Sequence, residues 1–136
     1  MSWVTRAVGA HLGDADVLEW LRRFRWPDGQ VRCPHCGSDQ VRAYLSSSHR
    51  RVVSTYRCRS CRRRFNDKTG TVFAQTRLPM TRWLTAAWLI ELGAGRRSLQ
   101  RYLRVDRATA RRIWNGLTRD TRLRQAMARS LEEFLT

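Results

Sequence analysis

The sequence predicts a small metal-bound α+β protein, in which a four-cysteine zinc ribbon built on a β-hairpin follows a short helix and precedes an all-α helix-turn-helix domain. Three observations support this prediction. Two Cys-x-x-Cys pairs lie 21 residues apart in the N-terminal half. Interrupted helical patterning fills the C-terminal half, and the 136 residues carry a formal net charge of +16. A chain of this length forms one domain or two small modules.

Residues 1–30 are expected to form an N-terminal helix and a turn. Asp14 is a suitable N-cap, and apolar residues follow it at helical spacing, at Val17, Leu18, Leu21 and Phe24. The run Trp26-Pro27-Asp28-Gly29 ends the helix, because proline cannot continue a helix and Asp-Gly favours a turn. The pattern therefore predicts a helix over 14–25.

The cysteine pairs indicate a zinc ribbon in residues 31–75. Two residues between thiolates let one tight turn aim both sulfurs at a single metal, and Gly37 supplies the backbone freedom that the first turn needs. Four thiolates complete a tetrahedral shell, so we expect one structural zinc ion without a catalytic role. Disulfides, a redox-active pair and ligation by His35 fit this spacing less well. The expected ligands are Cys33, Cys36, Cys58 and Cys61.

The strands of the ribbon are expected at 41–45 and 52–58, where β-like runs flank a polar tip. The later run Asp67-Lys68-Thr69-Gly70-Thr71 also spells the phosphorylation signature of P-type ion pumps. A pump needs a large membrane domain and nucleotide-binding machinery, for which 136 residues leave no room. We therefore interpret the run as a turn, after which residues 71–73 re-enter a strand.

Residues 76–120 are expected to form the helix-turn-helix domain, in which a short connector precedes three helices over 81–120 and the last two helices form the motif. Breaks are expected at Gly93-Ala94-Gly95 and near 104–106. Each helix has a suitable N-cap, respectively Thr81, Ser98 and Asp106. A short second helix, a tight turn and a capped third helix are typical of a helix-turn-helix. A plain helical bundle is the alternative.

A C-terminal helix is expected over 121–136. An apolar stripe runs along this helix and the end of the preceding one. This stripe can pair with a second copy of the chain in a homodimer, or it can pack back onto its own domain, and the sequence leaves both options open. The stripe consists of Leu117, Leu123, Met127, Leu131, Phe134 and Leu135.

The charge pattern indicates a nucleic-acid partner. The chain has 27 Lys+Arg against 11 Asp+Glu, and only Lys68 among the basic residues is not arginine. A charge of this size favours a polyanionic partner, and DNA is a better candidate than an anionic membrane. No apolar run of about 18 residues could span a membrane, and the N-terminus lacks an apolar signal core. We therefore expect a cytoplasmic protein that does not bind membranes.

Two groups of polar side chains are candidate nucleic-acid contacts. Arginines crowd the second cysteine pair and suit phosphate groups. On the third helix of the helical half, arginine and asparagine suit the edges of guanine and adenine in the major groove. A merely solvated basic face is the alternative for each group. The candidates are Arg57, Arg59, Arg62, Arg63 and Arg64 on the ribbon, and Arg107, Arg111, Arg112 and Asn115 on the helix.

Several motifs also occur in a fixed order along the chain. They are Arg25-Trp26-Pro27-Asp28-Gly29, Cys33-Pro34-His35-Cys36-Gly37-Ser38, Tyr56-Arg57-Cys58-Arg59-Ser60-Cys61-Arg62-Arg63-Arg64-Phe65, Thr69-Gly70-Thr71-Val72-Phe73, Leu78-Pro79-Met80 and Trp83. With the helix-turn-helix at 98–114, this set resembles the transposase zinc-ribbon module of bacterial insertion sequences of the ISXO type. The resemblance covers roughly 14–129 and implies recognition of transposon-end DNA by the ribbon and the helical part.

The chain also differs from the family that it resembles. In the family, an RNase-H-like domain with an acidic metal-binding triad follows the module and cuts and joins strands. This chain stops about where that domain begins, and its 11 acidic residues are scattered. Arg104 stands where the turn of the helix-turn-helix commonly holds a glycine, so a left-handed backbone there would be strained.

Together these observations predict a non-catalytic, sequence-preferring protein that binds duplex DNA through the ribbon and the helix-turn-helix. The alternative is a domesticated adaptor that docks on a larger protein or ribonucleoprotein complex. Such a complex would process nucleic acids in transposition or in a defence system of the CRISPR type, and the adaptor could bridge two copies of it.

Overall fold

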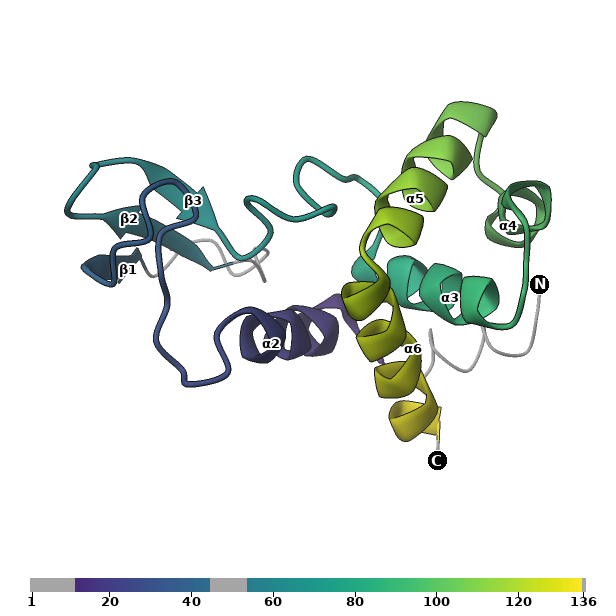
Figure 1. The fold of residues 1–136 in the computed structure, drawn as a ribbon, viewed down its shortest axis with the longest axis horizontal. Helices are drawn as coiled ribbons and strands as arrows, with labels where there is room; N and C mark the ends of the chain where they lie inside the picture. The colour runs from purple at the N-terminus through teal and green to yellow at the C-terminus, as the bar shows by residue number, and fades with distance from the viewer. Residues whose placement is uncertain (1–11, 45–53, 136) are drawn as a thin grey trace. The chain divides into compact units, whose positions relative to one another are not determined.

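The computed structural model describes residues 12–44 and 54–135. They form two compact units, one over Asp14–Thr76 and one that contains residues 77–135. We call them the ribbon unit and the helical unit. The ribbon unit contains one helix and a small sheet, and the helical unit is entirely α-helical (Figure 1).

The ribbon unit begins with helix α2, Asp14–Arg25, the range that the sequence predicts, although Asp14 is the first residue of the helix and not its N-cap. Acidic residues occupy its first turn and arginines its last turn, an arrangement that complements the helix dipole. Its apolar side is buried through Val17, Leu18 and Leu21. The chain then turns at Pro27-Asp28-Gly29, where Gly29 has a positive φ of 78°.

The sheet has three antiparallel strands in the order β1-β2-β3. They are β1 (Val41–Tyr44), β2 (Thr55–Cys58) and β3 (Arg64–Asn66). The predicted hairpin is confirmed for the described residues, whereas position 45 and positions 52–53 of the expected strands lie outside them. The third strand was not predicted.

The expectation of a strand over 71–73 is wrong. The segment forms turns in which the hydroxyl of Thr71 donates to the carbonyl of Lys68, and the amide of Ala74 donates to the carbonyl of Thr71. These local hydrogen bonds compete with strand pairing, a common effect of threonine in short connections. The apolar residue that suggested a strand, Phe73, is fully buried within these turns.

Alternation along the strands separates a buried face of the sheet from an exposed one. On the buried face, Tyr56 pairs with Phe65 in register, and their rings stack with centroids 5.1 Å apart. Trp26 meets Tyr56 edge-on at 5.8 Å. Cys33 and Cys58 belong to the same buried cluster, so the metal-binding sulfurs lie at the edge of an aromatic core.

The helical unit consists of α3 (Met80–Glu91), α4 (Arg96–Leu103), α5 (Arg107–Arg119) and α6 (Thr121–Leu135). Helix α3 packs against the three others, and α5 also contacts α4 and α6. The largest fully buried side chains of this unit are Trp83, Leu84, Leu99, Leu103, Ile113, Leu117, Met127 and Leu131. None of the helices in the described ranges is long and apolar enough to cross a membrane.

Two of the three N-caps predicted for the helical unit are wrong. Pro79 precedes α3 and Gly95 precedes α4, and Thr81 and Ser98 lie inside the helices. Both helices begin earlier than expected: glycine is an acceptable N-cap residue, and Pro79 has a φ of −54°, close to the helical value, although neither helix has a side-chain cap hydrogen bond. The cap of α5 is confirmed: the carboxylate of Asp106 accepts a hydrogen bond from the amide of Thr109 at 2.7 Å.

The turn between α4 and α5 contains a left-handed residue. Arg104 closes α4 with φ 53° and ψ 46°, the conformation that glycine adopts without strain. The side chain of Arg82 on α3 donates to the carbonyl of Leu103 just before this turn. Arg104 thus has the left-handed conformation that is strained for a residue other than glycine.

Most of the apolar stripe of the last two helices is buried inside the helical unit. Leu117, Leu123, Met127 and Leu131 are each at most 3% exposed, and α6 packs against α3. Intramolecular packing therefore accounts for most of the stripe, and Phe134 remains exposed. The side chain of Leu135 lies outside the described residues.

Candidate zinc centre and nucleic-acid interface

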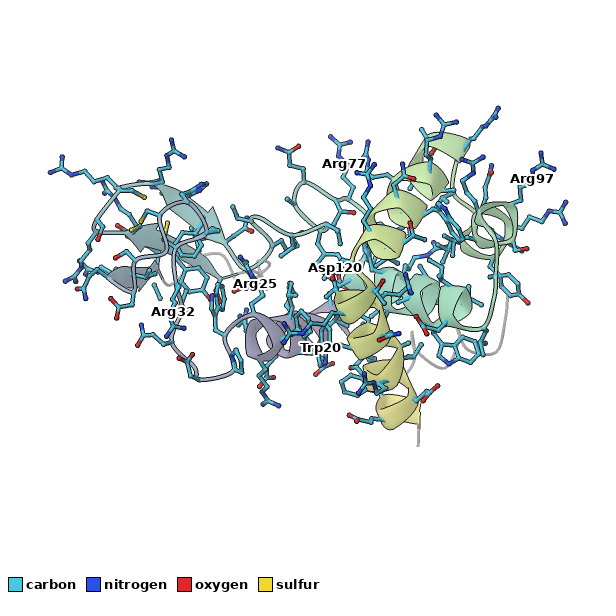
Figure 2. All side chains as sticks on the ribbon, viewed as in Figure 1. Trp20, Arg25, Arg32, Arg77, Arg97 and Asp120 are labelled. Carbon is cyan, nitrogen blue, oxygen red and sulfur yellow. The ribbon has the colours of Figure 1, made fainter. Side chains whose placement is uncertain are left out.

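The four cysteines of the ribbon converge on one point. Their sulfur atoms all lie within 4.8 Å of one another, and Figure 2 shows sulfur atoms gathered in the ribbon. The distance between the Sγ atoms of Cys33 and Cys61 is 3.7 Å, and that between Cys36 and Cys58 is 3.5 Å. Zn–S bonds of about 2.3 Å in a tetrahedron place the sulfurs about 3.8 Å apart. The donor set and its dimensions fit a closed, structural zinc site.

The two Cys-x-x-Cys turns are built alike. The amide of His35 donates to Cys33 Sγ at 3.4 Å, and the amide of Cys61 donates to Cys58 Sγ at 3.5 Å. The hydrogen bond from Cys61 is the largest contribution that lowers the pKa of the Cys58 thiol to about 6. Such amide contacts stabilise a thiolate, which is the form that binds zinc.

The position after each pair of cysteines has a left-handed backbone. Gly37 has φ 76° after the first pair, and Arg62 has φ 65° after the second pair. In both turns the amide of the first cysteine donates to a carbonyl five residues later, at 2.9 Å in the first turn and 3.0 Å in the second. An arginine therefore occupies the position that glycine fills in the matching turn.

Asp67 joins α2 to the sheet. Its carboxylate is fully buried and accepts hydrogen bonds from Arg22 at 2.8 Å, from the amide of Ser54 at 2.8 Å and from the hydroxyl of Tyr56 at 2.7 Å. Arg25, labelled in Figure 2, donates to the backbone carbonyl of Asp67 at 2.8 Å. Burial, followed by the hydrogen bond to Asp67, raises the pKa of Tyr56 to about 12. We call these contacts the Asp67 network.

All five candidate arginines of the ribbon are exposed. Arg57 and Arg64 face each other across β2 and β3, and Arg42 faces Arg57 from β1. Directly paired residues share a face of a sheet, so Arg42, Arg57 and Arg64 form one row across all three strands, which we call the arginine row. Among the described residues, none of the three forms an ion pair.

A hollow of about 290 Å³ adjoins the arginine row. It is lined by arginines from β1, β2 and the second cysteine turn, and by the half-exposed ring of Tyr44. Arg42 and Tyr44 were not among the contacts predicted from the sequence, although their alternation with Val41 and Ala43 places them on one face of a strand. The full lining is Arg42, Tyr44, Arg57, Cys58, Arg59 and Arg62.

The candidates in the helical unit lie on one exposed side of α5. Arg107, Arg111, Arg112 and Asn115 are all exposed, whereas Ala110, Ile113 and Leu117 are buried. Helix α4 adds exposed arginines to the same unit, among them Arg97, which projects into solvent (Figure 2). The side of α5 that does not pack in the unit is thus strongly basic.

Comparison with known proteins agrees with the ribbon geometry. Residues 12–64 match the family described as the transposase zinc-ribbon domain. The chain is 37% identical over 93 residues to an uncharacterized protein in transposable element ISH50 of Halobacterium salinarum, an alignment that covers 68% of this chain. The chain spans 30% of the length of that relative. No solved structure matches the chain.

Proposed function

We propose that this chain, whose residues 12–64 match the transposase zinc-ribbon domain family, binds duplex DNA without cutting it. The arginine row is the observation that carries the proposal. Like charges placed directly opposite each other on neighbouring strands destabilise a sheet. A bound polyanion relieves this repulsion, and DNA phosphates are the acceptors that arginine fits best. The zinc centre beside the row holds the arginines on a rigid support.

A second surface for DNA is the exposed side of α5. Helices α4 and α5 are separated by the turn at 104–106, and the spacing corresponds to a helix-turn-helix. In such a motif the second helix enters the major groove with its N-terminal residues near the bases. Arg107 and Arg111 lie near the start of α5, where an arginine can pair with the O6 and N7 atoms of guanine.

Substitutions on the two surfaces are expected to affect DNA binding in different ways. Arg111→Ala should weaken binding to a preferred duplex by about 1–3 kcal/mol and leave binding to a scrambled duplex nearly unchanged. Replacing Arg62 and Arg63 together with alanine should weaken binding to both duplexes alike, because phosphate contacts carry no base information. The measurement is a titration of each variant against a duplex selected from a random pool and its scrambled counterpart.

Arg129→Ala is the matched control, since Arg129 is an exposed arginine on α6. This substitution should lower the affinity for either duplex by no more than the loss of one exposed charge does. If Arg111→Ala weakens binding to both duplexes equally, α5 is only a basic face. The adaptor function would then replace sequence-preferring DNA binding. Homodimerisation remains a prediction that sedimentation of the intact chain tests.

We also propose that the chain has no strand-cutting activity of its own. Support comes from the potential metal ligands: within the described part of the chain, the four cysteines are the only group of three or more histidine, cysteine or acidic side chains close enough to share an ion. Purified protein with Mg²⁺ or Mn²⁺ should therefore neither nick nor join DNA. Cleavage that disappears when one of its carboxylates is replaced would contradict this proposal.

A further inference from the structure

We infer that the hollow beside the arginine row binds one unpaired nucleotide of DNA, with the base against the ring of Tyr44 and the phosphate among Arg42, Arg57 and Arg62. The inference rests on the proposed DNA binding and specifies it further: the ribbon would prefer DNA with an unpaired segment, such as a frayed or extended end, to a blunt duplex.

The chemistry of the lining fits a nucleotide. Tyr44 and Arg42 lie two residues apart on β1 and therefore point to the same face of the sheet. Arg57 is the cross-strand partner of Arg42, so the arginine row borders the ring directly. A hollow of about 290 Å³ is at the lower end of the range for small-ligand pockets, which suits one base. The lining contains no carboxylate.

The exposure of Tyr44 supports a stacking role. The ring is 40% exposed, whereas Tyr56 on β2 is 5% exposed. Aromatic rings on a sheet face, surrounded by basic residues, are the usual platform for unpaired bases, because every base offers a π-face. The bases of an intact duplex are stacked on one another, so their faces cannot reach the ring. A base on Tyr44 must therefore be unpaired.

The backbone at Arg62 gives independent support. Arg62 adopts the left-handed conformation that Gly37 has at the matching position of the first turn. A left-handed arginine is less stable there than glycine would be. Strained residues of this kind cluster at binding and switch sites, and of the three in the described chain (Arg62, Gln75 and Arg104) Arg62 is the one that lines the hollow. The side chain of Arg62 lines the hollow, so a role in binding accounts for the arginine.

The test compares a blunt duplex with the same duplex carrying a short single-stranded extension. The zinc-loaded chain should bind the extended duplex tighter by on the order of tenfold, the typical effect of one stacked base. Tyr44→Ala should abolish this preference and leave the affinity for the blunt duplex unchanged, and Tyr44→Phe should retain the preference. An extension made of abasic sites should give no preference, which distinguishes base stacking from phosphate contact.

Two glycine variants separate the hollow from general charge. Arg62→Gly should reduce the preference severalfold and leave the thermal transition unchanged or raise it, because the backbone strain is removed. Arg63→Gly removes the same charge from an exposed neighbour that does not line the hollow, and it should weaken binding to both DNAs alike.

Three outcomes would overturn the inference or its basis. Equal binding of blunt and extended duplexes by the unaltered chain removes the inference and leaves the proposed duplex binding intact. A preference that survives Tyr44→Ala places the unpaired base elsewhere and also removes the inference. Failure to bind either DNA removes the proposed function itself.

Discussion

Removing zinc is expected to unfold the ribbon sheet and to leave the helical unit folded. The sheet has three short strands and one aromatic cluster, too little buried apolar surface to fold without the metal. Structural zinc contributes on the order of 10 kcal/mol to the folding of such modules. The helical unit contains none of the four cysteines and has its own core. Chelation should therefore abolish the ribbon's thermal transition and retain most of the helical circular dichroism signal.

Cys58→Ser should have the same effect as chelation, because three thiolates cannot close the tetrahedral site. His35→Ala is the matched control. His35 lies between two of the cysteines, is exposed, and is not part of the ligand cluster. Metal analysis should find one zinc per chain in the native protein and in His35→Ala. An unchanged thermal transition after complete removal of zinc would show that the metal is not structural.

Asp67→Ala is expected to destabilise the ribbon unit by about 3 kcal/mol. The buried hydroxyl of Tyr56 and the amide of Ser54 lose their acceptor, and Arg22 loses its ion pair. Arg22 is partly exposed, so water compensates for part of that loss. Urea denaturation of the zinc-loaded protein measures the change in the free energy of unfolding.

Glu19→Ala is the control for Asp67→Ala. Glu19 pairs with Arg23 one helical turn away, and both side chains are exposed. Exposed pairs of this kind contribute about 0.5 kcal/mol or less. If Asp67→Ala costs no more than Glu19→Ala, the Asp67 network does not hold α2 to the ribbon.

The metal site and the main helices could be predicted from the sequence because their signals are local. The cysteine spacing fixes which sulfurs meet, and the geometry confirms that all four do. Helix α2 has regular apolar spacing with proline at its end, and both of its bounds agree with the prediction. Asp106 is followed by an apolar helical repeat, and it caps α5.

Features that depend on long-range contacts could not be predicted. Strand β3 is three residues long, which is too short for the alternation of apolar and polar residues to be recognised. Asp67 looked like a turn residue because its partners Arg22 and Tyr56 are 45 and 11 positions away. The arginine row becomes visible only when the register of the strands is known. Thr81 and Ser98 were chosen as caps on residue type alone, while Pro79 and Gly95 precede the helices.

The salt dependence of duplex binding measures whether the arginine row of the ribbon contacts DNA phosphates. Each phosphate contact contributes about −0.9 to the slope of log K against log salt concentration. If the arginine row contacts phosphates, replacing Arg57 and Arg64 with alanine should flatten the slope by about two units, and Arg129→Ala should not. A native slope near zero, or a slope that the double substitution leaves unchanged, would contradict DNA binding through the ribbon.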